Sequence, residues 1–236
     1  MRERPILFSG PMVRAILNWH KAQTRRICKV YLPPWGERDD DGWPMRQDKF
    51  GDFHREVSPY GEPGDRLWVR ETWGVMGSEM STALVAYAAR LPAGKTLADT
   101  DGGCNVITVP DEWRAKLDGL VNTERWRPSI HMPRWASRLT LEVTAVRVEP
   151  LQSLSEKDAR AEGVQEGEHG PWIPGAGLAD GYDSARDAYA DLWESLNGPD
   201  SWSRNPFVWV VKFRAKGHEE GLVRQSKLGK KAVAHG

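Results

Sequence analysis

Four side chains able to take part in binding or proton transfer lie within six residues near the N-terminus: Lys21, Thr24, Arg25 and Arg26. They follow the apolar pair Ile16–Leu17 directly, which suggests that they stand at the end of a helix. Cations at a helix C-terminus interact favourably with the helix dipole, so a charged helix end is the simplest interpretation of this cluster taken alone. Two later stretches favour a binding pocket instead.

The first of these stretches runs from Gly64 to Trp73 and places a carboxylate on the apolar side of a predicted strand. Leu67, Val69 and Glu71 share one face by alternation, while Arg66, Trp68 and Arg70 share the other. A carboxylate that faces a core is costly unless it is paired. Glu71 is therefore expected either to pair with Lys21 or an arginine, or to lie just past the core in water, and the pattern does not choose between these.

The second stretch, residues 125–138, carries four arginines, two tryptophans and His131, and Pro128 and Pro133 interrupt any helix or strand. Basic residues interleaved with aromatic ones are typical of surfaces that bind nucleic-acid backbones and unstacked bases. An isolated histidine is more often structural than catalytic, but this company favours a contact role for Ser129, His131 and Arg134. We expect Trp73 or Trp135 to stack on a base, and all three stretches to converge on one pocket for a base or nucleotide.

Composition limits the partners. The 236 residues carry a formal net charge of zero, so nucleic-acid binding would have to come from a local patch. The two cysteines, Cys28 and Cys104, are not spaced as a metal clip, and no ligand spacing implies a metal or another cofactor. The N-terminus has no uninterrupted apolar segment of the signal-peptide type, and nothing approaches a membrane span, so a cytoplasmic location is expected.

The periodicity predicts a mixed α+β chain. A first strand is expected near Pro5–Phe8, a helix from Pro11 to Trp19, long loops over 33–63 and 164–183, and a flexible basic tail from Lys216. Capping patterns at Ser153, Ser155 and Ser184 predict two further helices. The other predicted elements are strands at 66–71, 83–87, 106–109, 139–148 (with a bulge near Thr144–Ala145) and 207–213, the last central and buried on both sides, and a short helix capped by Asp111.

These motifs, in this order, resemble the ASCH domain of the PUA-like superfamily. The matching residues are Lys21, Thr24, Arg25 or Arg26, and the run Pro63–Glu71; residues 126–135 and 205–211 resemble phage and prophage proteins that carry this domain. The resemblance implies a small β-barrel flanked by helices. It also implies a single domain over 1–215 with insertions at about 33–63 and 74–125, followed by the tail 216–236.

The resemblance implies RNA, DNA or a modified nucleoside as partner. Some small ASCH proteins are amidohydrolases that release the acyl group of N4-acetylcytidine with a Lys, a Thr and a Glu, and these roles would fall on Lys21, Thr24 and Glu71. Lys21 could act as a base only if burial or the neighbouring arginines lowered its pKa far below about 10.4. A non-catalytic RNA- or DNA-binding module is the second expectation. A ribonuclease that uses His131 is the third.

Overall fold

The computed structural model describes residues 1–28, 39–40, 43–91, 104–121, 125–174 and 181–216. The chain divides into two compact units. The first unit comprises Met1–Arg2, Asn18–Arg66 and Glu142–Arg214, and the second comprises Glu3–Leu17, Leu67–Leu141 and, among the described residues, Ala215 and Lys216.

The first unit is built on strand β12 (Phe207–Lys216), which lies between β9 (Thr140–Pro150) and β2 (Gln23–Ile27). β12 runs antiparallel to β2 and pairs Val210 with Arg25 and Val211 with Thr24. All four residues from Val208 to Val211 are at most 1% exposed. The prediction of a central strand buried on both sides is confirmed.

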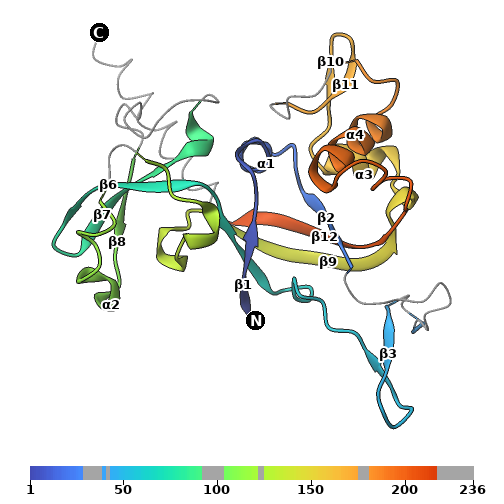
Figure 1. Ribbon diagram of the computed structural model, residues 1–236, viewed down its shortest axis with the longest axis horizontal. Helices are drawn as coiled ribbons and strands as arrows, with labels where there is room; N and C mark the ends of the chain where they lie inside the picture. Colours follow the sequence, from blue (N-terminus) through green and yellow to red (C-terminus); the bar gives the residue numbers. More distant parts are fainter. Residues whose placement is uncertain (29–38, 41–42, 92–103, 122–124, 175–180, 217–236) are drawn as a thin grey trace, which may run out of the picture. The chain divides into compact units, whose positions relative to one another are not determined.

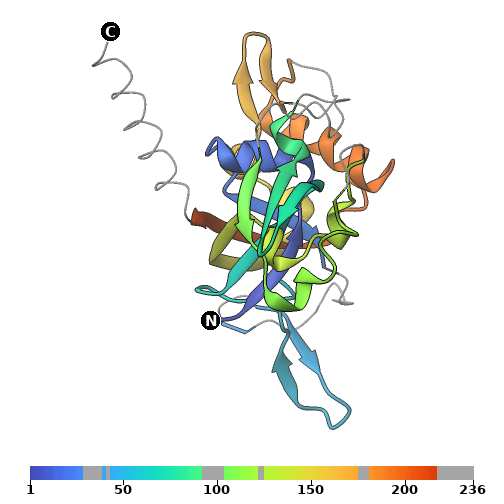
Figure 2. The same cartoon turned by 90° about the vertical axis from the view of Figure 1, so that its left-hand side faces the viewer.

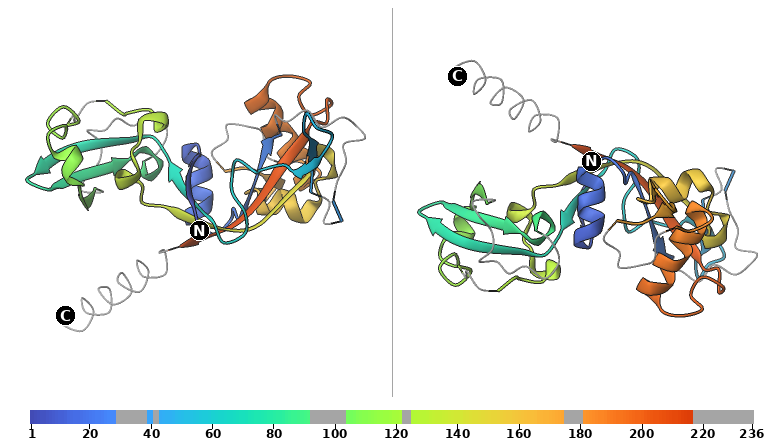
Figure 3. Two further views of the ribbon diagram at one scale, coloured as in Figure 1. Left: turned by 90° about the horizontal axis from the view of Figure 1, so that it is seen from below. Right: turned by 90° about the horizontal axis from the view of Figure 1, so that it is seen from above.

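Helices α3 (Glu156–Ala161) and α4 (Ala185–Asn197) lie together beside these strands (Figures 1 and 3). The side chains of Ser155 and Ser184 cap them by accepting from the N–H groups of Asp158 and Asp187, as the capping patterns predicted. Ser153 instead lies in a short 3-10 turn, η5 (Leu151–Ser153). The apolar stripe of α4 packs into a core with the strands; its members include Ala185, Ala188, Tyr189, Leu192, Trp193, Val208 and Val210.

Two hairpins occur where the sequence predicted only loop. Strands β3 (Met45–Gln47) and β4 (Phe53–Arg55) form the hairpin that projects downward in Figure 2. Trp43 connects its base to β12, because its ring lies 5.6 Å from that of Trp209. The indole N–H of Trp43 also donates to the Glu56 carbonyl at 2.6 Å.

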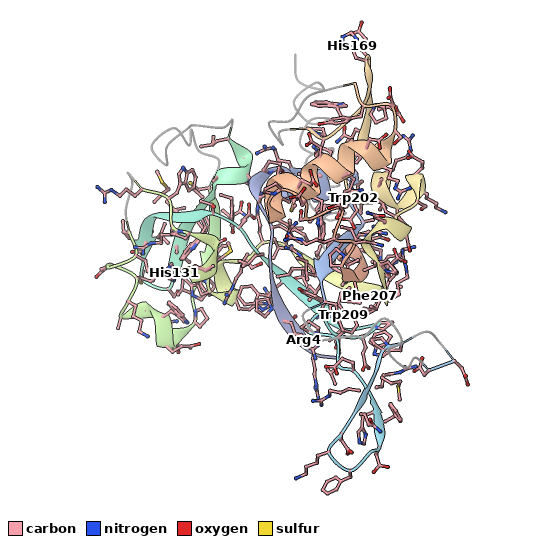
Figure 4. The ribbon with its side chains drawn as sticks, turned by 45° about the vertical axis from the view of Figure 1, so that its right-hand side comes forward. Arg4, His131, His169, Trp202, Phe207 and Trp209 are labelled. Carbon is pink, nitrogen blue, oxygen red and sulfur yellow. The ribbon has the colours of Figure 1, made fainter. Side chains whose placement is uncertain are left out.

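The second hairpin consists of β10 (Gln165–Gly167) and β11 (Gly170–Trp172), and Figure 4 shows His169 at its tip. Short hairpins of this kind lack the long alternating pattern by which strands are recognised, so the sequence did not show them.

The second unit contains β1 (Glu3–Leu7), α1 (Gly10–Leu17) and β5 (Arg66–Arg70), with β1 and β5 as neighbours. An antiparallel sheet, β6-β7-β8 (Trp73–Glu79, Thr82–Tyr87, Asn105–Thr108), occupies part of the predicted 74–125 insertion. Its core cluster includes Trp73, Val75, Val85, Tyr87, Val109, Leu117, Met132 and Ala136. The short elements are η1 (Ala88–Arg90), α2 (Asp111–Arg114), η3 (Ser129–His131) and η4 (Arg134–Ala136).

Two helix boundaries differ from the sequence predictions. The first helix ends at Leu17 rather than Trp19, and Trp19 adopts the left-handed backbone conformation with φ 62°. Helix α2 is a single turn whose N-cap is Pro110, so Asp111 is not the capping residue.

The chain has the predicted α+β composition, with more strands than helices. The described strands do not close into a barrel, so the predicted PUA-like barrel is not confirmed. None of the described helices has both the length and the apolar character that crossing a bilayer requires. The predicted tail lies outside the described residues, apart from Lys216.

The N-cap of α4 gives a first test of this fold. We expect Ser184→Ala to lower the free energy of unfolding by about 1 kcal/mol, because the N–H of Asp187 loses its acceptor. Urea denaturation measures the change. Ser184→Asp, which keeps an acceptor at the cap, is the matched control and should stay close to the parent; equal losses in both variants would contradict the cap.

Candidate functional site

Three of the four residues of the basic cluster near the N-terminus, all except Lys21, lie on a strand and not at a helix end. Thr24, Arg25 and Arg26 belong to β2 and pair with Val211, Val210 and Trp209 of β12. The ladder with β12 satisfies their backbone groups, and successive side chains point to opposite faces of the strand. The interpretation of a charged helix end is therefore wrong.

Arg25 is the centre of a buried ionic network. Its guanidinium contacts Glu149 at 2.7 Å, Glu162 at 3.2 Å and Asp158 at 3.6 Å, and its side chain is 0% exposed. Arg147 binds the same Glu149 and Asp158 carboxylates, at 2.6 and 3.2 Å. We call this group the Arg25 network; its members are Lys21, Gln23, Arg25, Arg147, Glu149, Asp158 and Glu162.

Gln23 and Ser155 complete the hydrogen bonding of the network. The Gln23 amide, oriented so that both its atoms are paired, donates to Asp158 Oδ1 at 3.1 Å and accepts from Arg25 Nη1 at 2.7 Å. Burial raises the pKa of Asp158, but the hydrogen bond from the Ser155 hydroxyl and the charges of Arg147 and Arg25 together lower it by more. The pKa of Asp158 therefore lies below its ordinary value. Asp158 is thus held ionised.

Lys21 is attached to this network through Glu162. Its Nζ donates to the backbone carbonyl of Glu162 at 2.7 Å and to the Oε2 of the same residue at 2.9 Å. Both side chains are 2% exposed. Glu71 was expected to pair with Lys21 or an arginine, or to lie in water, whereas the carboxylate in contact with Lys21 is that of Glu162.

Burial lowers the pKa of Lys21 below its ordinary value. Glu162 opposes this effect by charge and hydrogen bonding, while the charges of Arg26 and Arg25 add to it. Desolvation is the largest of these influences, so the neutral amine is more accessible than for a surface lysine. A lowered pKa is the direction of shift that a base role for Lys21 requires.

Thr24 lies three residues after Lys21 and is also buried, at 3% exposure. Arg26 follows on the same face of β2 as Thr24 and is half-buried. Lys21, Thr24, Arg25 and Arg26 thus all fall within the first unit, while the remaining predicted site residues fall within the second.

Glu71 in the second unit is 1% exposed and engaged by an arginine. Arg138 Nε and Nη2 donate to its two carboxylate oxygens, each at 2.8 Å, in a bidentate pair. The Arg138 guanidinium lies 4.3 Å from the Tyr87 ring centroid, and the Tyr87 hydroxyl donates to the Ala136 carbonyl at 2.9 Å. Of the two expectations for Glu71, the paired one is confirmed.

The two tryptophans expected to stack on a base differ in exposure: Trp73 is enclosed in the core of the second unit, and Trp135 is half-buried. Trp73 is 1% exposed and meets Trp135 edge-on, with ring centroids 6.0 Å apart. Trp135 is half-buried and also packs against Trp113 at 6.0 Å. The proposed stacking role of Trp73 is corrected accordingly, because its faces are occupied by the core of the second unit.

The other predicted contact residues lie on short 3-10 turns of the second unit. Ser129 is half-buried and His131 is exposed, both in η3 (Figure 4 labels His131). Arg134 in η4 is exposed; its Nε donates to Glu3 Oε2 at 2.9 Å and its Nη2 to Thr140 Oγ1 at 3.2 Å. Ser129, His131 and Arg134 therefore lie on one segment that is accessible to solvent.

Arg134 also takes part in an arrangement that the sequence analysis did not select as a site. The guanidinium carbons of Arg70 and Arg134 lie 4.7 and 6.0 Å from the Trp68 ring centroid. These two cations lie beside an indole that is itself only 8% exposed, and we call this positively charged group around a largely buried ring the Trp68 platform. The alternation of Arg66, Trp68 and Arg70 along one strand face was the signal that could have identified it.

The acidic members of the Arg25 network were also missed. Glu149, Asp158 and Glu162 lie more than 120 residues from Arg25 in sequence, and Asp158 and Glu162 were taken only as helix-capping and helix-end residues. The one local signal was Arg147 near the end of the predicted strand 139–148 and Glu149 just past it, since residues at i and i+2 share a face where the strand continues, as β9 does.

Within the described ranges, no three or more His, Cys, Asp and Glu side chains group as metal ligands would. Comparison with known proteins found no matching family model, no matching curated protein and no matching solved structure.

The Glu71–Arg138 pair yields a stability prediction. Glu71→Gln and Arg138→Gln should each lower the free energy of unfolding by about 3–5 kcal/mol, because each leaves a buried charge unpaired. The double variant should lose less than the sum of the two, which urea denaturation would measure.

Arg114→Gln provides the control for that prediction. This substitution breaks a surface ion pair between Arg114, whose side chain is 50% exposed, and Asp111, whose side chain is 83% exposed. It should change the free energy of unfolding by less than about 1 kcal/mol. Additive losses in the double variant would show that Glu71 and Arg138 do not stabilise the second unit as a pair.

Proposed function

We propose that this chain is an ASCH-type, PUA-like protein that acts on a modified nucleoside, as an amidohydrolase that removes an acyl group from an N4-acylated cytidine. The observation that carries the proposal is the environment of Lys21: a buried amine whose pKa is lowered, three residues before a buried threonine. The resemblance of the surrounding sequence to the ASCH domain supplies the substrate class.

The proposed chemistry requires a nucleophile and a base. Neutral Lys21 takes the proton of the Thr24 hydroxyl as the oxygen attacks the acyl carbonyl carbon. The tetrahedral intermediate collapses, the bond from the acyl carbon to N4 breaks, and the departing cytidine amine takes the proton from the Lys21 ammonium. Water then hydrolyses the acyl ester on Thr24, which releases the carboxylic acid and restores the hydroxyl.

Two structural facts constrain this mechanism. Lys21 and Thr24 are 4% and 3% exposed, so a substrate reaches them only after a local rearrangement. Glu71, the third residue implied by the resemblance, is held by Arg138 rather than by Lys21. Its proposed role in positioning water or protonating the leaving amine is therefore tested separately from that of Lys21.

The experiment is incubation of purified protein with N4-acetylcytidine, with cytidine release followed by chromatography. We expect turnover by the parent chain and a loss of turnover of at least about 100-fold in Lys21→Ala and Thr24→Ala. The turnover of Glu71→Gln is measured in the same assay and tests the role of Glu71 separately. Lys157→Ala removes an exposed lysine of α3 and should retain full activity. Turnover that survives all three site variants would refute the mechanism.

A non-catalytic RNA- or DNA-binding role is the second candidate, and the Trp68 platform favours it. Guanidinium groups bind phosphate oxygens, and the charge of Arg70 and Arg134 is concentrated around one indole. Because Arg134 is exposed and its hydrogen bonds to Glu3 and Thr140 lie at the surface, a phosphate can compete for it. Nothing in the described residues gives similar support to a ribonuclease that uses His131.

Binding of a labelled single-stranded oligonucleotide, measured by fluorescence anisotropy over a salt series, tests this second candidate. We expect Arg134→Gln to weaken binding and to reduce the slope of log affinity against log salt by about one. Arg204→Gln removes another exposed arginine, in the first unit, and should leave both quantities unchanged. An equal effect of the two substitutions would mean that binding is non-specific rather than located at the Trp68 platform.

A further inference from the structure

The Glu162 carboxylate is shared between two cations. One oxygen accepts from Lys21 Nζ at 2.9 Å, and the other accepts from Arg25 Nη1 at 3.2 Å. The backbone carbonyl of Glu162 also accepts from Lys21 Nζ, at 2.7 Å. Two of the three donors of the ammonium group are therefore directed at one residue.

Glu162 is itself fixed by its position. It is the C-cap of α3, and its N–H is bonded to carbonyls of the preceding turn, including that of Asp158 at 2.9 Å. The backbone next to it is also tied to the Lys21 segment, since the N–H of Ala22 donates to the Ala161 carbonyl at 2.9 Å. The lysine and the carboxylate are held together by main chain as well as by charge.

Charged and titratable groups from every neighbouring element face this pair. Arg25 and Arg26 come from β2, Asp158 from α3, Tyr189 from α4, and Glu149 and Arg147 from β9, while Lys212 on β12 acts on Asp158. Burial, together with the charge of Glu162, raises the pKa of Tyr189 well above its ordinary value, so this phenol stays neutral. Glu162 is the one member of this set whose carboxylate contacts Lys21 in the described residues.

We infer that Glu162 is a positioning residue: it orients the Lys21 amine and, through its charge, sets how readily the Lys21 ammonium group gives up its proton. This inference rests on the proposed function of Lys21 as a base. Arg25 acts one step further out, because it holds the second oxygen of Glu162 and so keeps the first directed at Lys21. Glu162 does not itself exchange a proton with the substrate.

The sign of the effect follows from electrostatics. The negative charge of Glu162 favours the ammonium form, so removing it makes the neutral amine more accessible and moves the pKa of Lys21 further down. A base with a lower pKa is deprotonated at lower pH, so the acid limb of the activity profile moves in the same direction. A purely structural role for Glu162 would lower stability without moving either quantity.

The test is an NMR titration of Lys21 in the full chain with 13C-labelled lysine. The Lys21 signal is identified as the one that is missing in Lys21→Arg. In Glu162→Gln we expect the pKa of Lys21 to fall by about one unit or more, the size of shift that an opposite charge at this range produces. Glu162→Asp, which keeps the charge one methylene further away, should give a smaller fall and remains informative if Glu162→Gln does not fold. Glu166→Gln, an exposed glutamate that pairs with Arg160, is the control and should leave the pKa unchanged.

The two proposals fail in different ways. An unchanged Lys21 pKa in the folded Glu162 variants would overturn the inference, whatever the turnover. Absence of acyl-cytidine hydrolysis in the parent chain would refute the proposed function, while the titration would still decide what Glu162 does. Where turnover is present, the acid limb of kcat/KM should move to lower pH in Glu162→Gln, and a limb that stays in place would also overturn the inference.

Discussion

The burial of one guanidinium organises the first unit. Arg25 has no exposed side-chain surface, and a buried charge is tolerated only where opposite charges and hydrogen bonds surround it. The carboxylates that meet this need come from β9, from within α3 and from its C-cap, so the position of each element is constrained by one side chain on β2. Removing a partner leaves an uncompensated charge, which makes the network a strong constraint on geometry rather than a large net source of stability.

The second unit depends on packing as well as on a buried ion pair. Trp73, Trp135 and Trp113 meet edge-on in its core, and Glu71 and Arg138 form a bidentate pair near Tyr87. Tryptophan provides a large apolar surface, which a small sheet with short strands requires for a core of its own. Packing in this core accounts for Trp73, Trp113 and Trp135.

These two environments give the predicted site residues different chemical characters. For Lys21, the lowering of the pKa by desolvation outweighs the raising of the pKa by the Glu162 carboxylate. A lysine pKa lowered in this way is common for functional amines, and structural ion pairs also produce it. Glu71 lies where an arginine occupies both of its oxygens and holds it as an acceptor. The proposed ASCH-type mechanism assigns both residues to one catalytic site. In the structure, Lys21 contacts Glu162 and Glu71 contacts Arg138, and neither of these partners belongs to the motif.

The sequence by itself determined the local features of this protein. Alternation specified the buried face of β5, a near-continuous apolar run specified the burial of β12 on both sides, and capping residues specified the starts of α3 and α4, because these signals act over a few neighbouring residues. Only the tertiary structure decided the partners of the charges. Glu162 and Glu149 lie 137 and 124 residues from Arg25, and the attraction between them depends on distance in space, which no local pattern encodes. The same reason explains why the basic cluster looked like a helix end: the place of Thr24, Arg25 and Arg26 on β2 is fixed by pairing with β12, a strand more than 180 residues away.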